Sequence, residues 1–234
     1  MSSKSTKTSF GLSPLFIVVL ALLTAIAPLA TDMYLAALPA VAENLNTTST
    51  NASLTLSSFM VGMALGQLVV GPLSDKTGRR KPLLIGAVVC FIATVACGFA
   101  PNIELLIFAR FLMGFTGSIG AVLARSMVAD TTEGLGTAKL MGVMMMINGF
   151  APVLAPLFGG WVLSWGNWRD IFHVLGVITA LMMLGVIFVI KETLPVEKRY
   201  TGTTLSVYSE LPKVFKIRRY MGFMLTMCFA FGAL

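Results

Sequence analysis

Two ionisable side chains interrupt long apolar runs, where an ionised group is costly. Asp32 lies in the run 14–38 and Arg110 in the run 103–128. Insertion scales assign about 2.5–3.5 kcal/mol to a charged side chain at the centre of a membrane helix, so such residues usually serve an ion or substrate pathway. At about 1.5 Å per residue, Asp32 lies roughly 27 Å along its run, and Arg110 lies about 12 Å from the start of its own.

These depths are comparable when the two runs cross a membrane in opposite directions. We therefore expect the Asp32 carboxylate and the Arg110 guanidinium to line one cavity. Arginine stays charged in proteins, so it would bias the protonation of the carboxylate. Proton exchange at Asp32 is the chemistry that this pair would supply. An alternative stays open, in which Asp32 is hydrated near the membrane boundary and only caps the following turn.

The segment 71–82 is a second candidate, because five charged residues lie between flanks of twenty residues that have none. Its predicted functional residues are Gly71, Asp75, Gly78, Arg79 and Arg80. Gly71 permits the close approach of another helix, and Gly78 permits a positive φ. The carboxylate is close enough in sequence to both arginines for a local ion pair. We predict a helix–turn–helix at a water boundary, with a loop that only fixes topology as the alternative.

The composition predicts an all-α integral membrane protein. The chain is 56% hydrophobic and 12% charged, whereas soluble domains have about 25% charged residues. The net charge of +7 does not indicate nucleic acid, because the basic residues lie in loops. Three cysteines and one histidine lack the spacing of a metal site. The sequence has neither a nucleotide-binding motif nor a catalytic cluster. We therefore expect no enzyme activity and no cofactor, and any energy coupling would have to use an ion gradient.

Apolar runs of about 20 residues predict six membrane spans. They are 14–38, 52–73, 83–100, 103–128, 138–163 and 171–190. We interpret residues 1–13 as a cytoplasmic tail, 14–190 as a six-helix bundle, 191–220 as a cytoplasmic linker with an amphipathic helix, and 221–234 as a seventh helix cut short. A similar spacing of glycine and arginine recurs in the first three and the last three predicted spans, with opposite orientation. This favours two inverted three-helix repeats.

The distribution of basic residues predicts the orientation. With the N-terminus inside, every Lys and Arg except Arg110 and Arg169 lies on the inner side. Positive residues gather in cytoplasmic loops of membrane proteins. The N-terminus is therefore expected to be cytoplasmic.

The run 138–163 contains a group of prolines and small residues. These residues are Pro152, Ala155, Pro156, Gly159 and Gly160. Proline bends a membrane helix, and small residues let a neighbouring backbone approach closely. We expect a bent helix with one small-residue packing face.

Several of these segments resemble one family. The segment 71–83 resembles the signature loop between helices two and three of the major facilitator superfamily, with its glycine, aspartate and basic positions all present. The segments 31–39, 110–114, 125–130, 155–160, 168–172 and 192–195 are similar to the twelve-helix drug:proton antiporter group, and within it to the Bcr/CflA subfamily.

The resemblance implies proton-coupled export of small drug-like compounds by alternating access. It places Asp32 at the acidic position of helix one and Arg110 at the helix-four arginine linked to proton transfer. It assigns 151–160 to the antiporter motif, and it gives Arg79 an expected partner in Asp130. Two departures are Met113, where a polar residue is common, and Ala155, where the general pattern has glycine.

The family pattern has two six-helix halves, so this chain is expected to be the N-terminal half of a transporter in the bacterial inner membrane. Its expected partners are the lipid bilayer, protons, a small-molecule substrate and the missing C-terminal half. We do not expect residues 1–234 alone to transport. Two alternatives stay open: an uptake or metabolite carrier of the same superfamily, and a membrane subunit of an ATP-driven permease.

Overall fold

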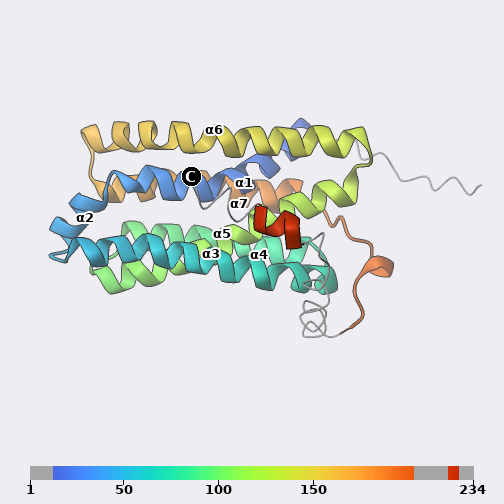
Figure 1. Cartoon of the computed structure of the whole chain (residues 1–234), viewed down its shortest axis with the longest axis horizontal. Helices are drawn as coiled ribbons and strands as arrows, with labels where there is room; N and C mark the ends of the chain where they lie inside the picture. The colour runs from blue at the N-terminus through green and yellow to red at the C-terminus, as the bar shows by residue number, and fades with distance from the viewer. Residues whose placement is uncertain (1–12, 203–220, 227–234) are drawn as a thin grey trace, which may run out of the picture.

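A computed structural model describes residues 13–202 and 221–226 of the chain (Figure 1). Most of the described residues lie in helices, and none of them lies in a strand. The helices are α1 Pro14–Leu35, α2 Leu38–Asn44, α3 Ser49–Thr77, α4 Arg80–Gly98, α5 Ile103–Thr131, α6 Leu135–Trp165 and α7 Trp168–Val189, followed by the short 3₁₀ helix η1 Val196–Lys198.

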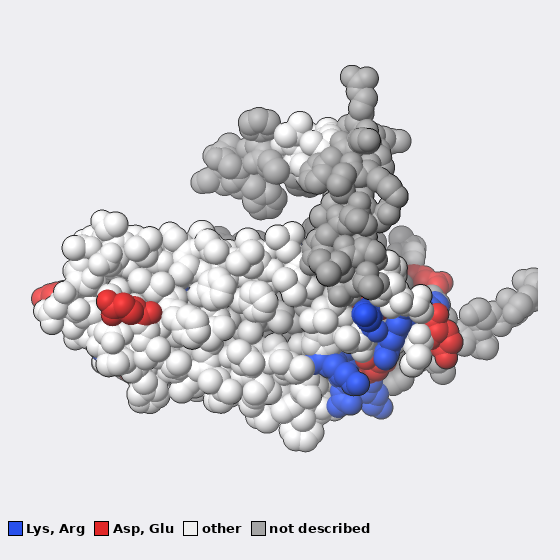
Figure 2. All heavy atoms as spheres, turned by 90° about the horizontal axis from the view of Figure 1, so that it is seen from below, with Lys and Arg blue, Asp and Glu red and all other residues white. Residues whose placement is uncertain are grey.

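Six of these helices, all except α2 and η1, are long and apolar enough to cross a membrane. They run side by side along the long axis of the bundle (Figure 1). Figure 2 shows that charged side chains gather near the two ends of the visible face, while uncharged side chains cover its middle. A lipid-facing surface needs this arrangement, because hydrocarbon cannot solvate charge. The predicted all-α membrane fold is confirmed.

The helix boundaries differ from the predicted runs at two places. The run 14–38 divides, because α1 ends at Leu35 and α2 begins at Leu38 with Pro39 in its first turn. The segment 71–82 is mostly helical rather than a turn, since α3 continues to Thr77 and α4 begins at Arg80. The connection itself is therefore only two residues long.

The packing of the helices shows an internal repeat. Helix α3 packs along α5 as α6 packs along α1, and α4 packs against α5 as α7 packs against α1. Exchanging α1, α3 and α4 for α5, α6 and α7 therefore reproduces the main packing pairs of the bundle. Because α5 is the fourth span in chain order, it crosses the bundle in the direction opposite to α1. This arrangement matches the expected pair of inverted three-helix units.

Some predictions concern residues that the structure does not describe. The tail 1–12, the amphipathic helix expected within 203–220 and the end of the seventh helix, 227–234, lie outside the described residues. Residues 221–226 are helical. This is consistent with the expected start of a seventh span.

Candidate functional site

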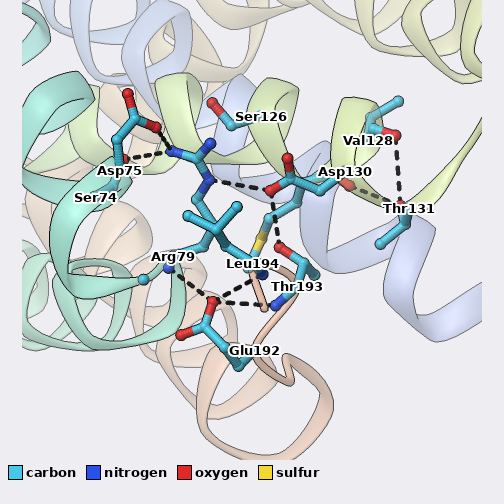
Figure 3. A network of polar contacts seen from close by, with 12 residues as sticks. Ser74, Asp75, Arg79, Ser126, Val128, Asp130, Thr131, Glu192, Thr193 and Leu194 are labelled. Atoms are coloured by element: carbon cyan, nitrogen blue, oxygen red, sulfur yellow. Dashed lines mark hydrogen bonds and ion pairs between the residues drawn. The ribbon is translucent and has the colours of Figure 1, made fainter. Parts of the chain in front are cut away.

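One candidate centre lies around the connection between α3 and α4, where Arg79 binds two acidic residues (Figure 3). Its Nε donates to Asp130 Oδ2 at 3.0 Å. Its Nη1 donates to Asp75 Oδ1 at 2.5 Å and to Ser74 Oγ at 2.7 Å. The partner expected for Arg79, Asp130, is therefore present. We call Ser74, Asp75, Arg79 and Asp130 the Arg79 network.

Three elements position this network. The last turn of α3 provides Ser74 and Asp75, the connection provides Arg79, and the end of α5 provides Asp130. The Arg79 residue is 8% exposed. Burial alone would lower the pKa of the Arg79 guanidinium, but the hydrogen bonds and negative charges of Asp130 and Asp75 outweigh burial and raise it. The cation is therefore stabilised although it is buried.

The other residues predicted for this segment have different surroundings. Gly78 has φ of +92°, a conformation that side-chain-bearing residues rarely adopt, so glycine is required there. Arg80 is exposed and donates from Nη2 to the Ile187 carbonyl at 3.3 Å. The carboxylate of Asp75 pairs with Arg79 and not with Arg80. A Cβ atom on Gly71 would have no neighbour within 4 Å. The close approach expected at Gly71 is therefore not made among the described residues.

The sequence interpretation assigned no role to Glu192, which binds the same connection. Its Oε1 accepts from the backbone N–H of Arg79 at 2.8 Å and from those of Thr193 and Leu194 at 3.1 Å each. Its Oε2 lies 3.4 Å from Arg199 Nη2. Burial would raise the pKa of the Glu192 carboxyl, but these backbone donors and the charge of Arg199 outweigh burial and lower it.

Arg110 forms a second centre, in the interior of the bundle. The residue is 0% exposed. Its Nη1 donates to the Ala30 carbonyl at 2.9 Å, and its guanidinium carbon lies 4.6 Å from the Tyr34 ring centroid and 4.5 Å from that of Phe59. Phe172 is a third aromatic neighbour at 5.7 Å. The Nε and Nη2 atoms are buried without a hydrogen-bond partner. Three aromatic rings, one carbonyl and the Met113 sulfur, 3.9 Å from Nη1, therefore surround this cation.

The structure contradicts the expectation that Asp32 and Arg110 line one cavity. Arg110 contacts α1 at Ala30 and Tyr34, which lie four residues apart on one side of the helix. Asp32 is two residues from each, which places it about 200° around the helix axis. It is partly exposed and makes no ion pair within the described chain. The Asp32 side chain therefore lies on the face of α1 opposite to the face that Arg110 contacts.

The predicted small-residue motif divides between two faces of α6, which continues through both prolines. Ala155 and Gly159 are buried, and a Cβ atom on Gly159 would overlap the backbone of Met33 in α1. Pro152, Pro156 and Gly160 are exposed on the remaining surface. Only part of the motif therefore packs within this bundle.

These features define a multi-pass membrane protein with an inverted repeat and a charged connection bound by acidic residues. The chain matches the family model of the Major Facilitator Superfamily over residues 20–234, and it belongs to that family.

The relatives include drug-resistance proteins. The chain is 40% identical over 215 residues to the uncharacterized MFS-type transporter YdgK of Bacillus subtilis, covering 91% of this chain and 54% of the relative. It is 29% identical over 220 residues to a bicyclomycin resistance protein homolog of Haemophilus influenzae, covering 94% and 55%. It is 30% identical over 168 residues to the multidrug resistance protein MdtL of Escherichia coli, covering 72% and 43%.

The chain spans about half the length of these curated relatives. Among solved structures, the human organic anion transporter MFSD10 superimposes with a TM-score of 0.58 at 18% identity, over 80% of this chain and 49% of that protein. At this identity the likeness concerns the fold alone. It supports the assignment of the six described spans to one helical bundle fold.

Proposed function

We propose that the full-length protein exports small drug-like compounds across the bacterial inner membrane in exchange for protons, with this chain as its N-terminal half. The relatives named for bicyclomycin and multidrug resistance support export of this substrate class. The observation that carries proton exchange is Asp32, a partly exposed carboxylate on a membrane-spanning helix that makes no ion pair with the residues that the structure describes. A carboxylate with no permanent counter-ion can gain and lose a proton during a transport cycle.

Arg110 has an indirect role in this proposal. Its guanidinium binds the Ala30 carbonyl, two residues before Asp32, and touches the Tyr34 ring, two residues after it. Arg110 therefore positions the turn of α1 that carries the carboxylate, without touching the carboxylate. This replaces the expected direct contact with an effect through the α1 backbone.

In the proposed orientation, the N-terminus and the Arg79 network lie on the cytoplasmic side, as the bias of basic loop residues favours. Alternating access requires the cytoplasmic ends of the two halves to separate and close. The network lies at the α3–α4 connection, next to this boundary, and is proposed to stabilise one of the two states. Pro152, Pro156 and Gly160 present an exposed α6 surface to the proposed second half.

The experiment uses the full-length gene in a drug-hypersusceptible bacterial host and in everted membrane vesicles. We expect a rise in drug resistance, and drug accumulation in the vesicles that a protonophore abolishes. Asp32→Asn should abolish both, because the amide cannot exchange a proton. Glu104→Gln, at the first turn of α5, is the matched acidic control and should retain both.

Two results would contradict the proposal. Undiminished proton-driven accumulation by Asp32→Asn would exclude Asp32 as the proton site. Drug-independent uptake of a metabolite into intact cells would instead favour the uptake carrier. Residues 1–234 expressed alone should be inactive in both assays.

A further inference from the structure

We propose that Glu192 is a positioning residue that joins the segment after α7 to the Arg79 network, so that the two form and separate as one unit. We call residues 190–200 the α7 strap. The effect on transport rests on the proposed function, whereas the contacts on which the inference is built do not.

The first observation is the start of α4, which has no capping side chain of its own. Three other helices are capped by the residue just before them, namely α3 by Thr48, α5 by Asn102 and α7 by Asn167. The residue before α4 is Arg79, whose side chain makes no capping hydrogen bond. The free N–H groups at a helix start attract an acceptor, preferably an anionic one.

Glu192 supplies that acceptor from a distant part of the chain. Its carboxylate accepts from the backbone N–H of Arg79 at 2.8 Å and lies 3.4 Å from that of Arg80. These two residues are the N-cap and first residue of α4. A side chain more than a hundred residues away in sequence thus performs the capping that a local Ser, Thr, Asp or Asn performs elsewhere.

The connection is shaped to receive this carboxylate. A Cβ atom on Gly78 would overlap Glu192 Oε2 and would lie 2.7 Å from Arg199 Nη2. A side chain at this position would have to displace the flexible ends of Glu192 and Arg199, and it would strain a backbone with φ of +92°. Arg199 lies 3.4 Å from Glu192 Oε2, so it holds the carboxylate against the connection.

The strap also touches both acidic residues of the Arg79 network, and Figure 3 shows its contact with Asp130. Thr193 Oγ1 donates to Asp130 Oδ2 at 3.2 Å, and this oxygen also accepts from Arg79 Nε. The backbone N–H of Tyr200 donates to the Asp75 carbonyl at 2.9 Å. Displacing the strap would thus uncap α4 and remove a donor from Asp130 in one movement. The strap precedes the segment expected to link the two halves of the protein. A movement of that segment that displaced the strap would therefore also displace Glu192 from the α3–α4 connection.

The test measures amide hydrogen exchange by mass spectrometry on the full-length protein in lipid nanodiscs. In Glu192→Gln, the Arg79 and Arg80 amides should exchange about tenfold faster, because a charge-assisted acceptor becomes neutral. Glu197→Gln is the matched control. It lies in η1 on the same strap and makes no hydrogen bond or ion pair with the network in the described part of the chain, so exchange should not change.

Asp130→Asn tests whether the strap and the network form one unit. Asp130 touches neither amide, yet its substitution should also accelerate both if the two are coupled. Arg199→Met should act in the same direction with a smaller effect, and it serves if Glu192→Gln fails to fold. Unchanged Arg79 and Arg80 exchange in Asp130→Asn, or equal exchange in the Glu192 and Glu197 variants, would overturn the proposal.

Transport gives an independent readout. In the double variant Asp130→Asn with Glu192→Gln, the loss of transport rate should be no larger than that of the worse single variant, whereas independent residues would give the product of the two losses. Because the exchange measurement needs no substrate, it tests the strap even if the protein exports no drug. A product of losses, with normal substrate affinity, would contradict the coupling and leave the proposed export intact.

Discussion

Arg79 and Arg110 are both buried arginines in one bundle, but their charges are stabilised in opposite ways. Arg79 is held by two carboxylates and a hydroxyl at the end of the bundle. Arg110 is held by one carbonyl and three aromatic rings, with Nε and Nη2 unpaired. The comparison teaches that burial alone does not tell whether a charge stabilises a membrane protein. The neighbouring atoms decide it.

The difference predicts opposite effects of the same substitution. Removing one partner of a satisfied ion cluster leaves the others buried without compensation, which is destabilising. Removing a buried cation that has few partners relieves a desolvation cost and is neutral or stabilising. Methionine replaces the charged side chain by a shorter, unbranched apolar one at both sites, so the two variants can be compared directly.

The largest expected effect is that of Arg79→Met. It should lower the free energy of unfolding by about 2–3 kcal/mol, because Asp130 and Asp75 lose their charged donor. Equilibrium unfolding of the full-length protein in bicelles measures it. Arg80→Met is the control, since Arg80 is exposed and makes one long hydrogen bond to a carbonyl, and its effect should be much smaller. Equal losses of unfolding free energy in Arg79→Met and Arg80→Met would contradict the stabilising role of the Arg79 network.

The next prediction concerns Arg110→Met. It should raise the free energy of unfolding by about 1–2 kcal/mol, because an incompletely paired cation is replaced by a flexible apolar side chain. Transport should nevertheless be lost, since the turn that carries Asp32 loses its support. A destabilised Arg110→Met would show that the aromatic rings compensate the charge fully.

A smaller effect is expected for Tyr34→Phe, which keeps the ring beside Arg110 and removes one hydroxyl. The Tyr34 hydroxyl lies 3.0 Å from Thr55 Oγ1 in a buried hydrogen bond. Its loss should lower the free energy of unfolding by about 1 kcal/mol. Transport should persist if the ring is what holds Arg110. Tyr34→Ala, which removes the ring as well, is the variant that should lose transport.

The smallest effect depends on pH and belongs to Glu192. Its folded pKa is lowered by backbone donors and Arg199, although burial opposes this. Its stabilising contribution is therefore complete above the ordinary glutamate pKa of about 4.3 and is lost as pH falls further toward the folded value. We expect less than about 1 kcal/mol, because the carboxylate is partly solvated. Melting temperatures of wild type and Glu192→Gln should differ equally at pH 7 and pH 5, and the difference should shrink as pH falls below about 4.3. A difference in melting temperature that did not shrink between pH 5 and pH 3 would contradict this assignment.

Much of the fold was accessible from the sequence. Each of the six spans was predicted at its place, because a membrane helix needs a continuous apolar run and the loops need charge. The helix ends were less accurate, since amphipathic turns such as 71–77 extend α3 beyond the hydrocarbon-compatible run. Local polarity cannot show where hydrogen bonding along a helix stops.

The candidate sites were accessible in part. The ion pair between Asp75 and Arg79 is a local i, i+4 contact, and it is present. The role of Glu192 was missed, because nothing near it in the sequence indicates the distant helix start that it caps. The expected contact of Asp32 with Arg110 was wrong, because equal depth along two helices does not specify the face on which each side chain lies.

The sequence by itself determined the class of protein, the number of spans and the presence of charged residues within them. These follow from apolar length and from the cost of charge in hydrocarbon, which act on each segment separately. The tertiary structure alone decided the remaining partners: Glu192 at the α3–α4 connection, aromatic rings around Arg110, and an opposite face of α1 for Asp32. Partners depend on helix rotation and on chain segments far apart in sequence, and packing of the whole bundle sets both.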